Sequence, residues 1–145
     1  MTETAKWLSV AIAILAFAGV AVSGVALHNH YGHDKTSFCE IGQNFDCDIV
    51  NRSSYSSIAG IPVALIGILG YAALAALATV YRSKAETPAL LFAGGLAGLG
   101  FALYLTYVEA YVLATWCILC LSSLVLISLI TTLSAVRLAH WMRKA

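Results

Sequence analysis

Four long apolar segments constrain this chain more than any other feature of its sequence. They run over residues 7–27, 58–81, 89–112 and 117–138, and the first two contain no charged residue. Crossing the hydrocarbon core of a membrane takes about 20 apolar residues in a helix, so each segment is long enough to span it. Only 10% of the 145 residues are charged, whereas a soluble domain has about 25%. We predict an all-α integral membrane protein, a bundle of four transmembrane helices forming one domain over residues 1–145.

The first segment has one alternative interpretation, a cleavable signal peptide. Ala21 and Ser23 would make a passable cleavage site. The apolar stretch is longer, however, than the roughly 7–15 residues that form the apolar core of a signal peptide. We therefore interpret residues 7–27 as a retained span.

The lysines and arginines that flank the segments predict the orientation of the bundle. Residues 28–57 carry two of them, and the loop before the fourth segment carries none. Basic residues accumulate in the cytoplasmic loops of membrane proteins. Both termini are therefore expected in the cytoplasm, with residues 28–57 as a long outer loop. The other six lysines and arginines flank the opposite ends of the segments, and the prediction depends on them: Lys6, Arg82, Lys84, Arg137, Arg143 and Lys144.

The same orientation places all four cysteines on the outer side, where disulfides persist. Cys117 and Cys120 form a C-x-x-C at the start of the fourth segment, and residues three apart share one face of a helix. The partial positive charge of a helix amino terminus favours a thiolate. Cys39 and Cys47 lie in the outer loop, where they are either a permanent staple or a mobile thiol shuttle. A structural zinc site is a third reading, because zinc uses the same C-x-x-C spacing.

Several motifs between Cys39 and Cys120 occur together in one known family. Ser53 lies six residues after Cys47, Gly60-Ile-Pro62 precedes the second apolar run, and the C-x-x-C begins the last span. In this combination the chain resembles the vitamin K epoxide reductase family. The resemblance implies a four-helix bundle around a quinone, with a short lid helix over about residues 51–57 of the outer loop.

The resemblance also implies a role for each site residue. Cys39 would receive electrons from a thioredoxin-like (DsbA-like) thiol protein, and Cys47 would attack Cys117. Cys120 would then be released as the thiolate that reacts with the quinone, and Ser53 would donate a hydrogen bond to a quinone carbonyl. The implied acceptor is a quinone of the ubiquinone or menaquinone type, and the transfer needs no metal.

Two departures separate the chain from the vertebrate members of the family. Those enzymes carry Thr-Tyr-Ala shortly after the C-x-x-C, where residues 121–124 here read Leu-Ser-Ser-Leu. Ser56 stands where the vertebrate lid has an asparagine, and it is a candidate quinone-binding residue. The sequence ends at Ala145 without a fused thioredoxin-like domain, so a separate partner is expected. These features are typical of the bacterial or archaeal branch, which resides in the cytoplasmic membrane and drives disulfide formation.

Three further residues of the third segment are candidates for the quinone site. Tyr104 and Tyr107 recur at helical spacing with Tyr111, and they line either a quinone headgroup or the membrane interface, where tyrosines accumulate. Glu109 is an ionisable residue at the membrane edge, and it either supplies protons to the quinone or extends its carboxylate to water. Three histidines outside the first segment are more typical of a solvated loop than of a metal site: His28, His30 and His33.

Two other functions remain open on the sequence alone. The first is a reductase for vitamin K quinone or its epoxide. The second is a non-enzymatic scaffold or metal-handling membrane protein with stapled loops. A net charge of +1 gives no indication of a nucleic-acid partner.

Overall fold

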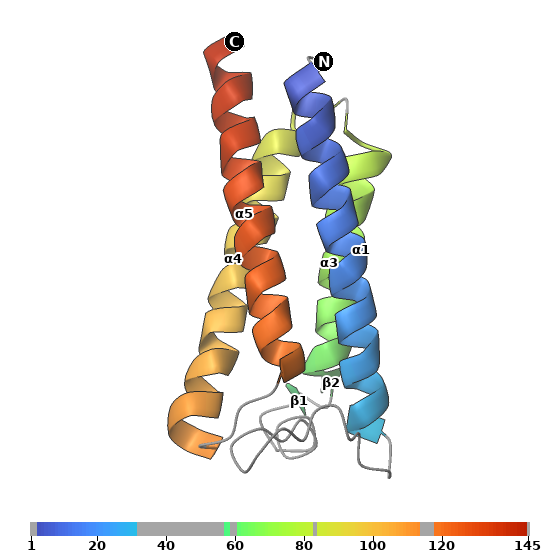
Figure 1. Cartoon of the computed structure of the whole chain (residues 1–145), viewed down its shortest axis with the longest axis vertical. Helices are drawn as coiled ribbons and strands as arrows, with labels where there is room; N and C mark the ends of the chain where they lie inside the picture. Colours follow the sequence, from blue (N-terminus) through green and yellow to red (C-terminus); the bar gives the residue numbers. More distant parts are fainter. Residues whose placement is uncertain (1–2, 32–56, 59–60, 83, 114–117, 145) are drawn as a thin grey trace.

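A computed structural model describes residues 3–31, 57–58, 61–82, 84–113 and 118–144 of the chain. Its main elements are four long helices, α1 (Glu3–Tyr31), α3 (Val63–Thr79), α4 (Thr87–Tyr107) and α5 (Ile118–Lys144). They lie side by side along one axis, with the amino and carboxyl termini at the same end (Figure 1). The predicted all-helical bundle is therefore confirmed. The lid helix predicted over residues 51–57 stays a prediction, because residues 51–56 lie outside the described residues.

Three of these helices are long and apolar enough to cross a membrane: α1, α4 and α5. The remaining helix, α3, is equally apolar in character but has 17 residues. At the end of α4 the backbone continues into a π-helical segment, η3 (Val108–Leu113). The first, third and fourth predicted spans thus correspond to described helices.

The second span begins later than the sequence analysis predicted. Instead of a helix from Ile58, the structure has two short antiparallel strands, β1 (Ser57–Ile58) and β2 (Ile61–Pro62), in which Ile58 pairs with Ile61. A proline disfavours helical geometry in the residue before it, so Ile61 is extended and α3 starts only after Pro62. The prediction of a helix over 58–81 was wrong at this boundary.

Two other helices extend past their predicted ends. The first continues to Tyr31, so His28 lies in α1 and not in the outer loop that was predicted to begin there. The last continues to Lys144 instead of ending near Leu138. Neither extension contains a glycine or proline that would stop a helix. The predictions counted only apolar residues, whereas a helix can continue past the membrane into water.

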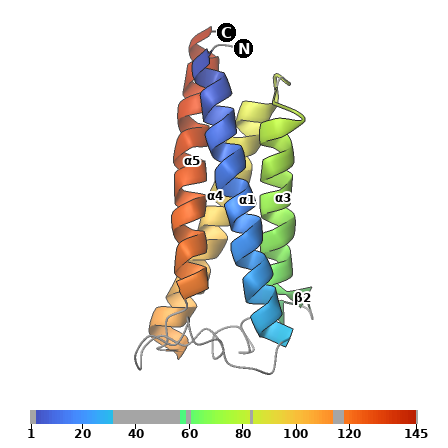
Figure 2. The same ribbon diagram turned by 45° about the vertical axis from the view of Figure 1, so that its right-hand side comes forward.

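The helices pack in a defined order. Figures 1 and 2 show α1 beside both α3 and α5, and α4 behind α5. By comparison, α3 and α4 touch each other less extensively. Many of the side chains in the buried core are small, which lets the backbones approach closely in lipid. The core residues are Ile12, Ala13, Ala16, Tyr71, Leu74, Ala75, Ala78, Leu91, Ile127 and Ile130.

Glycines on α4 make the close approach to its neighbours possible. A Cβ at Gly95 would lie 3.2 Å from the Cα of Thr131, and one at Gly98 would lie 3.0 Å from the side chain of Ile127. Both contacts are with α5. Small residues in this segment therefore serve helix packing.

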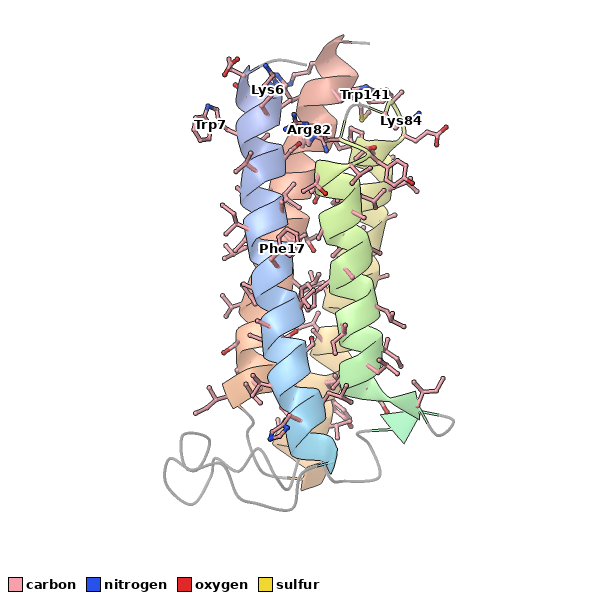
Figure 3. All side chains as sticks on the ribbon, turned by 90° about the vertical axis from the view of Figure 1, so that its right-hand side faces the viewer. Lys6, Trp7, Phe17, Arg82, Lys84 and Trp141 are labelled. Atoms are coloured by element: carbon pink, nitrogen blue, oxygen red, sulfur yellow. The ribbon has the colours of Figure 1, made fainter. Side chains whose placement is uncertain are left out.

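Basic side chains gather at the end of the bundle that holds both termini. Figure 3 shows Lys6, Arg82 and Lys84 there, together with Trp7 and Trp141. We call this the basic end. The loop between α3 and α4 closes it, and the carbonyl oxygens of that loop accept hydrogen bonds from helix side chains. Thr87 Oγ1 donates to the carbonyl of Tyr81, and Arg137 donates to the carbonyl of Arg82 at 2.6 Å.

Candidate functional site

Cys120 lies in the first turn of α5, at the end of the bundle opposite the basic end (Figure 1). We call this the cysteine end. The side chain is partly buried in a small apolar cluster centred on Ala26 of α1 and Leu119. Val22 of α1 and Ala64 of α3 pack against the same cluster. Three helices therefore surround the predicted quinone-reactive cysteine.

Most of the other predicted site residues lie outside the part of the chain that the structure describes. Glu109 belongs to η3, but its side chain lies outside the described residues. The predicted roles of Glu109 and of these other residues stay predictions. The residues that lie wholly outside the described ranges are Cys39, Cys47, Ser53, Ser56 and Cys117.

Tyr104 and Tyr107 are on the exposed side of α4. Their exposed fractions are 50% and 58%, and the ring of Tyr107 lies 5.2 Å, centroid to centroid, from that of Tyr111. This exposure in the isolated chain suits contact with the membrane interface, the alternative stated for these tyrosines. A role at a quinone remains a prediction for both.

A buried tyrosine that was not among the predicted site residues contacts α5 about one turn after Cys120. Tyr71 of α3 is 5% exposed, and its hydroxyl is 2.9 Å from the carbonyl oxygen of Ser123, to which it donates. The same hydroxyl is 2.8 Å from Ser123 Oγ. Ser123 follows Cys120 by three residues, so the two lie on one face of α5, about one turn apart.

The Tyr71 ring also contacts α1. A Cβ at Gly19 would overlap the ring atoms of Tyr71, so only glycine fits at this position of α1. One turn closer to the cysteine end, a Cβ at Gly67 would lie 2.7 Å from the hydroxyl of Ser23, which is buried. The half of the bundle behind Cys120 therefore presents hydroxyl groups from α1, α3 and α5.

One sequence signal pointed to Tyr71. A tyrosine near the middle of an apolar span must bring its hydroxyl to a hydrogen-bond partner, because lipid offers none. The candidates chosen from the sequence were the three tyrosines of the third segment, and neither Tyr71 nor Tyr81 of the second. The spacing of residues along the sequence does not reveal which helix supplies the hydrogen-bond partner of Tyr71.

A depression at the basic end is not a candidate for redox chemistry. It has a volume of about 310 Å³ and lies between α3 and α4, at the end of the bundle opposite Cys120. None of its lining residues is a cysteine or a histidine: they are Leu77, Tyr81, Lys84, Ala85, Glu86, Thr87 and Leu90.

A comparison with models of known families agrees with the motifs. Residues 10–135 match the vitamin K epoxide reductase family. The matched range begins in α1, ends in α5 and includes all four cysteines. Because the match extends over most of the sequence, this chain belongs to the vitamin K epoxide reductase family of membrane oxidoreductases.

Proposed function

We propose that the protein is a thiol–disulfide oxidoreductase that accepts electrons from a separate thioredoxin-like protein and passes them to a membrane quinone. The observation that carries this proposal is the position of Cys120. It lies in the first turn of an apolar helix, partly buried among α1 and α3. A cysteine at a helix amino terminus has its thiolate stabilised by the helix dipole and the unpaired N–H groups.

The proposed electron path uses all four cysteines. The partner dithiol reduces the Cys39–Cys47 disulfide and becomes a disulfide itself. The Cys47 thiolate then attacks Cys117, which breaks the Cys117–Cys120 disulfide and releases Cys120 as a thiolate. Cys39 resolves the mixed disulfide and restores the loop pair.

The reduced pair Cys117 and Cys120 then gives two electrons to the quinone and re-forms its disulfide. Two protons accompany the electrons, so the quinone leaves as a quinol and the reaction balances without a metal. Every cycle converts one dithiol of the partner into a disulfide, which the partner passes on to newly exported proteins.

The described residues around Cys120 have the chemistry that a quinone requires. A quinone ring is apolar and carries two carbonyl acceptors. Cys120 packs against the apolar cluster of Ala26 and Leu119, as Val22 and Ala64 also do, and hydroxyl groups follow one turn further in, at Ser123 and Tyr71. A site of apolar walls with a few placed polar groups is typical for small molecules of this kind.

The proposed location is the cytoplasmic membrane of a bacterium or an archaeon. The basic end would face the cytoplasm, because lysines and arginines remain on that side during insertion. The first turn of α5, which carries Cys120, lies at the other end (Figure 1), so thiol exchange would take place outside, where disulfides persist.

The test is oxidation of a reduced thioredoxin-like protein by the purified protein and a short-chain ubiquinone or menaquinone. We expect quinone-dependent loss of partner thiols. Cys120→Ala should lower turnover by roughly a thousandfold or more, since it removes a reacting atom. Ser128→Ala is the matched control on the same helix, because this hydroxyl bonds within its own helix, at the carbonyl of Leu124. Undiminished turnover in Cys120→Ala would refute the proposal.

A trapping experiment tests the path itself. With Cys39 and Cys120 replaced by alanine, Cys47 and Cys117 remain as two thiols, and diamide, which accepts the two electrons, joins them in a disulfide if they can meet; no third cysteine is left to resolve it. We expect a cross-linked peptide pair in a digest analysed by mass spectrometry. Its absence under oxidising conditions would contradict the loop relay and leave direct reduction of Cys117 by the partner.

The family match supports a second candidate, reduction of vitamin K quinone or its epoxide. The residues 121–124 and Ser56 depart from the vertebrate pattern, which argues against the epoxide. A dithiol-driven assay with vitamin K epoxide separates the two functions. No formation of vitamin K quinone would exclude the epoxide activity.

A further inference from the structure

Tyr71 joins three helices at one point. Its backbone belongs to α3, its ring lies on Gly19 of α1, and its hydroxyl meets both the carbonyl oxygen and the Oγ of Ser123 on α5. In the described structure three other α5 residues have hydroxyls that bond to their own helix, at the carbonyl four residues earlier. These are Ser128, Thr131 and Thr132.

The contact lies where α5 needs support. The first turn of a helix has N–H groups without intrahelical partners, so it frays more readily than the interior. Cys120 lies in that turn, and Ser123 lies on the same face in the next one. A bond that fixes Ser123 to α3 therefore limits the movement of the turn that carries Cys120.

We propose that Tyr71 is a positioning residue of the redox centre. Through Ser123 it holds the first turn of α5, so that the sulfur of Cys120 stays against the apolar cluster centred on Ala26 and Leu119. The inference rests on the proposed function only for the statement that Cys120 carries the chemistry. The position of the sulfur itself can be tested without quinone or partner.

The experiment measures the rate at which N-ethylmaleimide alkylates Cys120 in the reduced, full-length protein, resolved by peptide mass spectrometry. Tyr71→Phe keeps the ring on Gly19 and removes only the hydroxyl. We expect the alkylation rate of Cys120 to rise about threefold or more, the effect of losing roughly one hydrogen bond. Quinone-dependent kcat should fall by a similar factor while KM for the partner is unchanged.

A double-mutant cycle tests whether Tyr71 acts on Cys120 through Ser123. Ser123→Ala removes the Oγ that bonds the Tyr71 hydroxyl and leaves the carbonyl that accepts from it, so its effect should be smaller than that of Tyr71→Phe. The double variant should match Tyr71→Phe alone, because both substitutions act on the same contact. Ser128→Ala is the control on the same helix and should leave the alkylation rate unchanged.

The outcomes separate positioning from packing. If Tyr71→Phe lowers the thermal midpoint but leaves the alkylation rate of Cys120 as in the wild type, Tyr71 only stabilises the bundle and the inference is overturned. If Tyr71→Phe does not fold, Ser123→Ala takes its place in the test. An alkylation rate of Cys120 equal to that of the wild type in this variant then overturns the inference. A wild-type protein without quinone-linked activity would refute the proposed function, while the alkylation rates would still decide the role of Tyr71.

Discussion

The two ends of the bundle use buried polar side chains for different purposes. At the basic end, Thr87 and Arg137 donate hydrogen bonds to backbone carbonyls of the short loop between α3 and α4. Toward the cysteine end, Tyr71 and Ser123 link two helices through their side chains. Polar groups in a membrane must find partners inside the protein. One end uses them to close a turn, and the other to fix the helix that carries a reactive sulfur.

This difference predicts where a substitution should affect stability alone and where it should also affect chemistry. Changes at the basic end are expected to lower the free energy of unfolding and leave the reactivity of Cys120 intact. Changes at the Tyr71 contact are expected to alter both.

Gly19→Ala should have the largest effect on stability. The added Cβ would overlap the ring of Tyr71, and Tyr71 cannot move without losing its bonds to Ser123. Such overpacking should lower the free energy of unfolding by about 3 kcal/mol, measured by thermal or denaturant unfolding in detergent. Quinone-dependent turnover should fall as well, because the contact behind Cys120 is displaced.

Gly24→Ala is the matched control on the same helix. A Cβ at Gly24 has open space around it, and alanine is favoured over glycine in a helix by about 1 kcal/mol or less. The free energy of unfolding should therefore stay the same or rise. Equal losses at Gly19 and Gly24 would mean that the contact with Tyr71 is not what requires glycine.

Arg137→Met should have the next largest effect, confined to stability. The side chain is 3% exposed, and its guanidinium donates to the carbonyl of Arg82. Losing a hydrogen bond from a charged group should lower the free energy of unfolding by about 2 kcal/mol. Arg143, which is exposed on the same helix, gives the control variant Arg143→Met with little expected change. A changed alkylation rate of Cys120 in folded Arg137→Met would break the division between the two ends.

Thr87→Val should act at the same loop with about half that effect. The substitution keeps the shape of the buried side chain and removes the hydroxyl that bonds the carbonyl of Tyr81. A neutral hydrogen bond contributes about 1 kcal/mol. Thr132→Val, whose hydroxyl is exposed and bonds within α5, should change the unfolding midpoint by much less. A larger loss for Thr132 than for Thr87 would contradict the assignment of the loop contact.

The sequence predicted the features that depend on composition along one helix. Apolar length predicted the four helices, and the flanking basic residues predicted that Lys6, Arg82 and Lys84 gather at one end, as Figure 3 shows. The C-x-x-C predicted a cysteine at the start of the last helix, where Cys120 lies. The motifs between Cys39 and Cys120 identified the family correctly.

The features that sequence reasoning missed depend on contacts between helices or on local backbone geometry. Tyr71 and Ser123 are 52 residues apart, and their pairing follows from how α3 and α5 are rotated about their axes, which spacing does not reveal. The start of α3 at Val63 follows from the backbone restriction that Pro62 places on Ile61. A count of apolar residues from Ile58 reveals neither the contact between Tyr71 and Ser123 nor the start of α3.

The smallest predicted effect has the opposite sign to the others and concerns two serines on α1 and α5. Among the residues that the structure describes, the hydroxyls of Ser9 and Ser134 are fully buried and have no hydrogen-bond partner. A buried polar group without a partner destabilises the fold, and alanine fits the same space in a helix. Ser9→Ala and Ser134→Ala should each raise the free energy of unfolding by up to about 1 kcal/mol, with the alkylation rate of Cys120 unchanged. A clear loss of stability in both variants would mean that each hydroxyl holds a water or another group inside the bundle. Buried polar groups away from the cysteine end would then do more than close a loop.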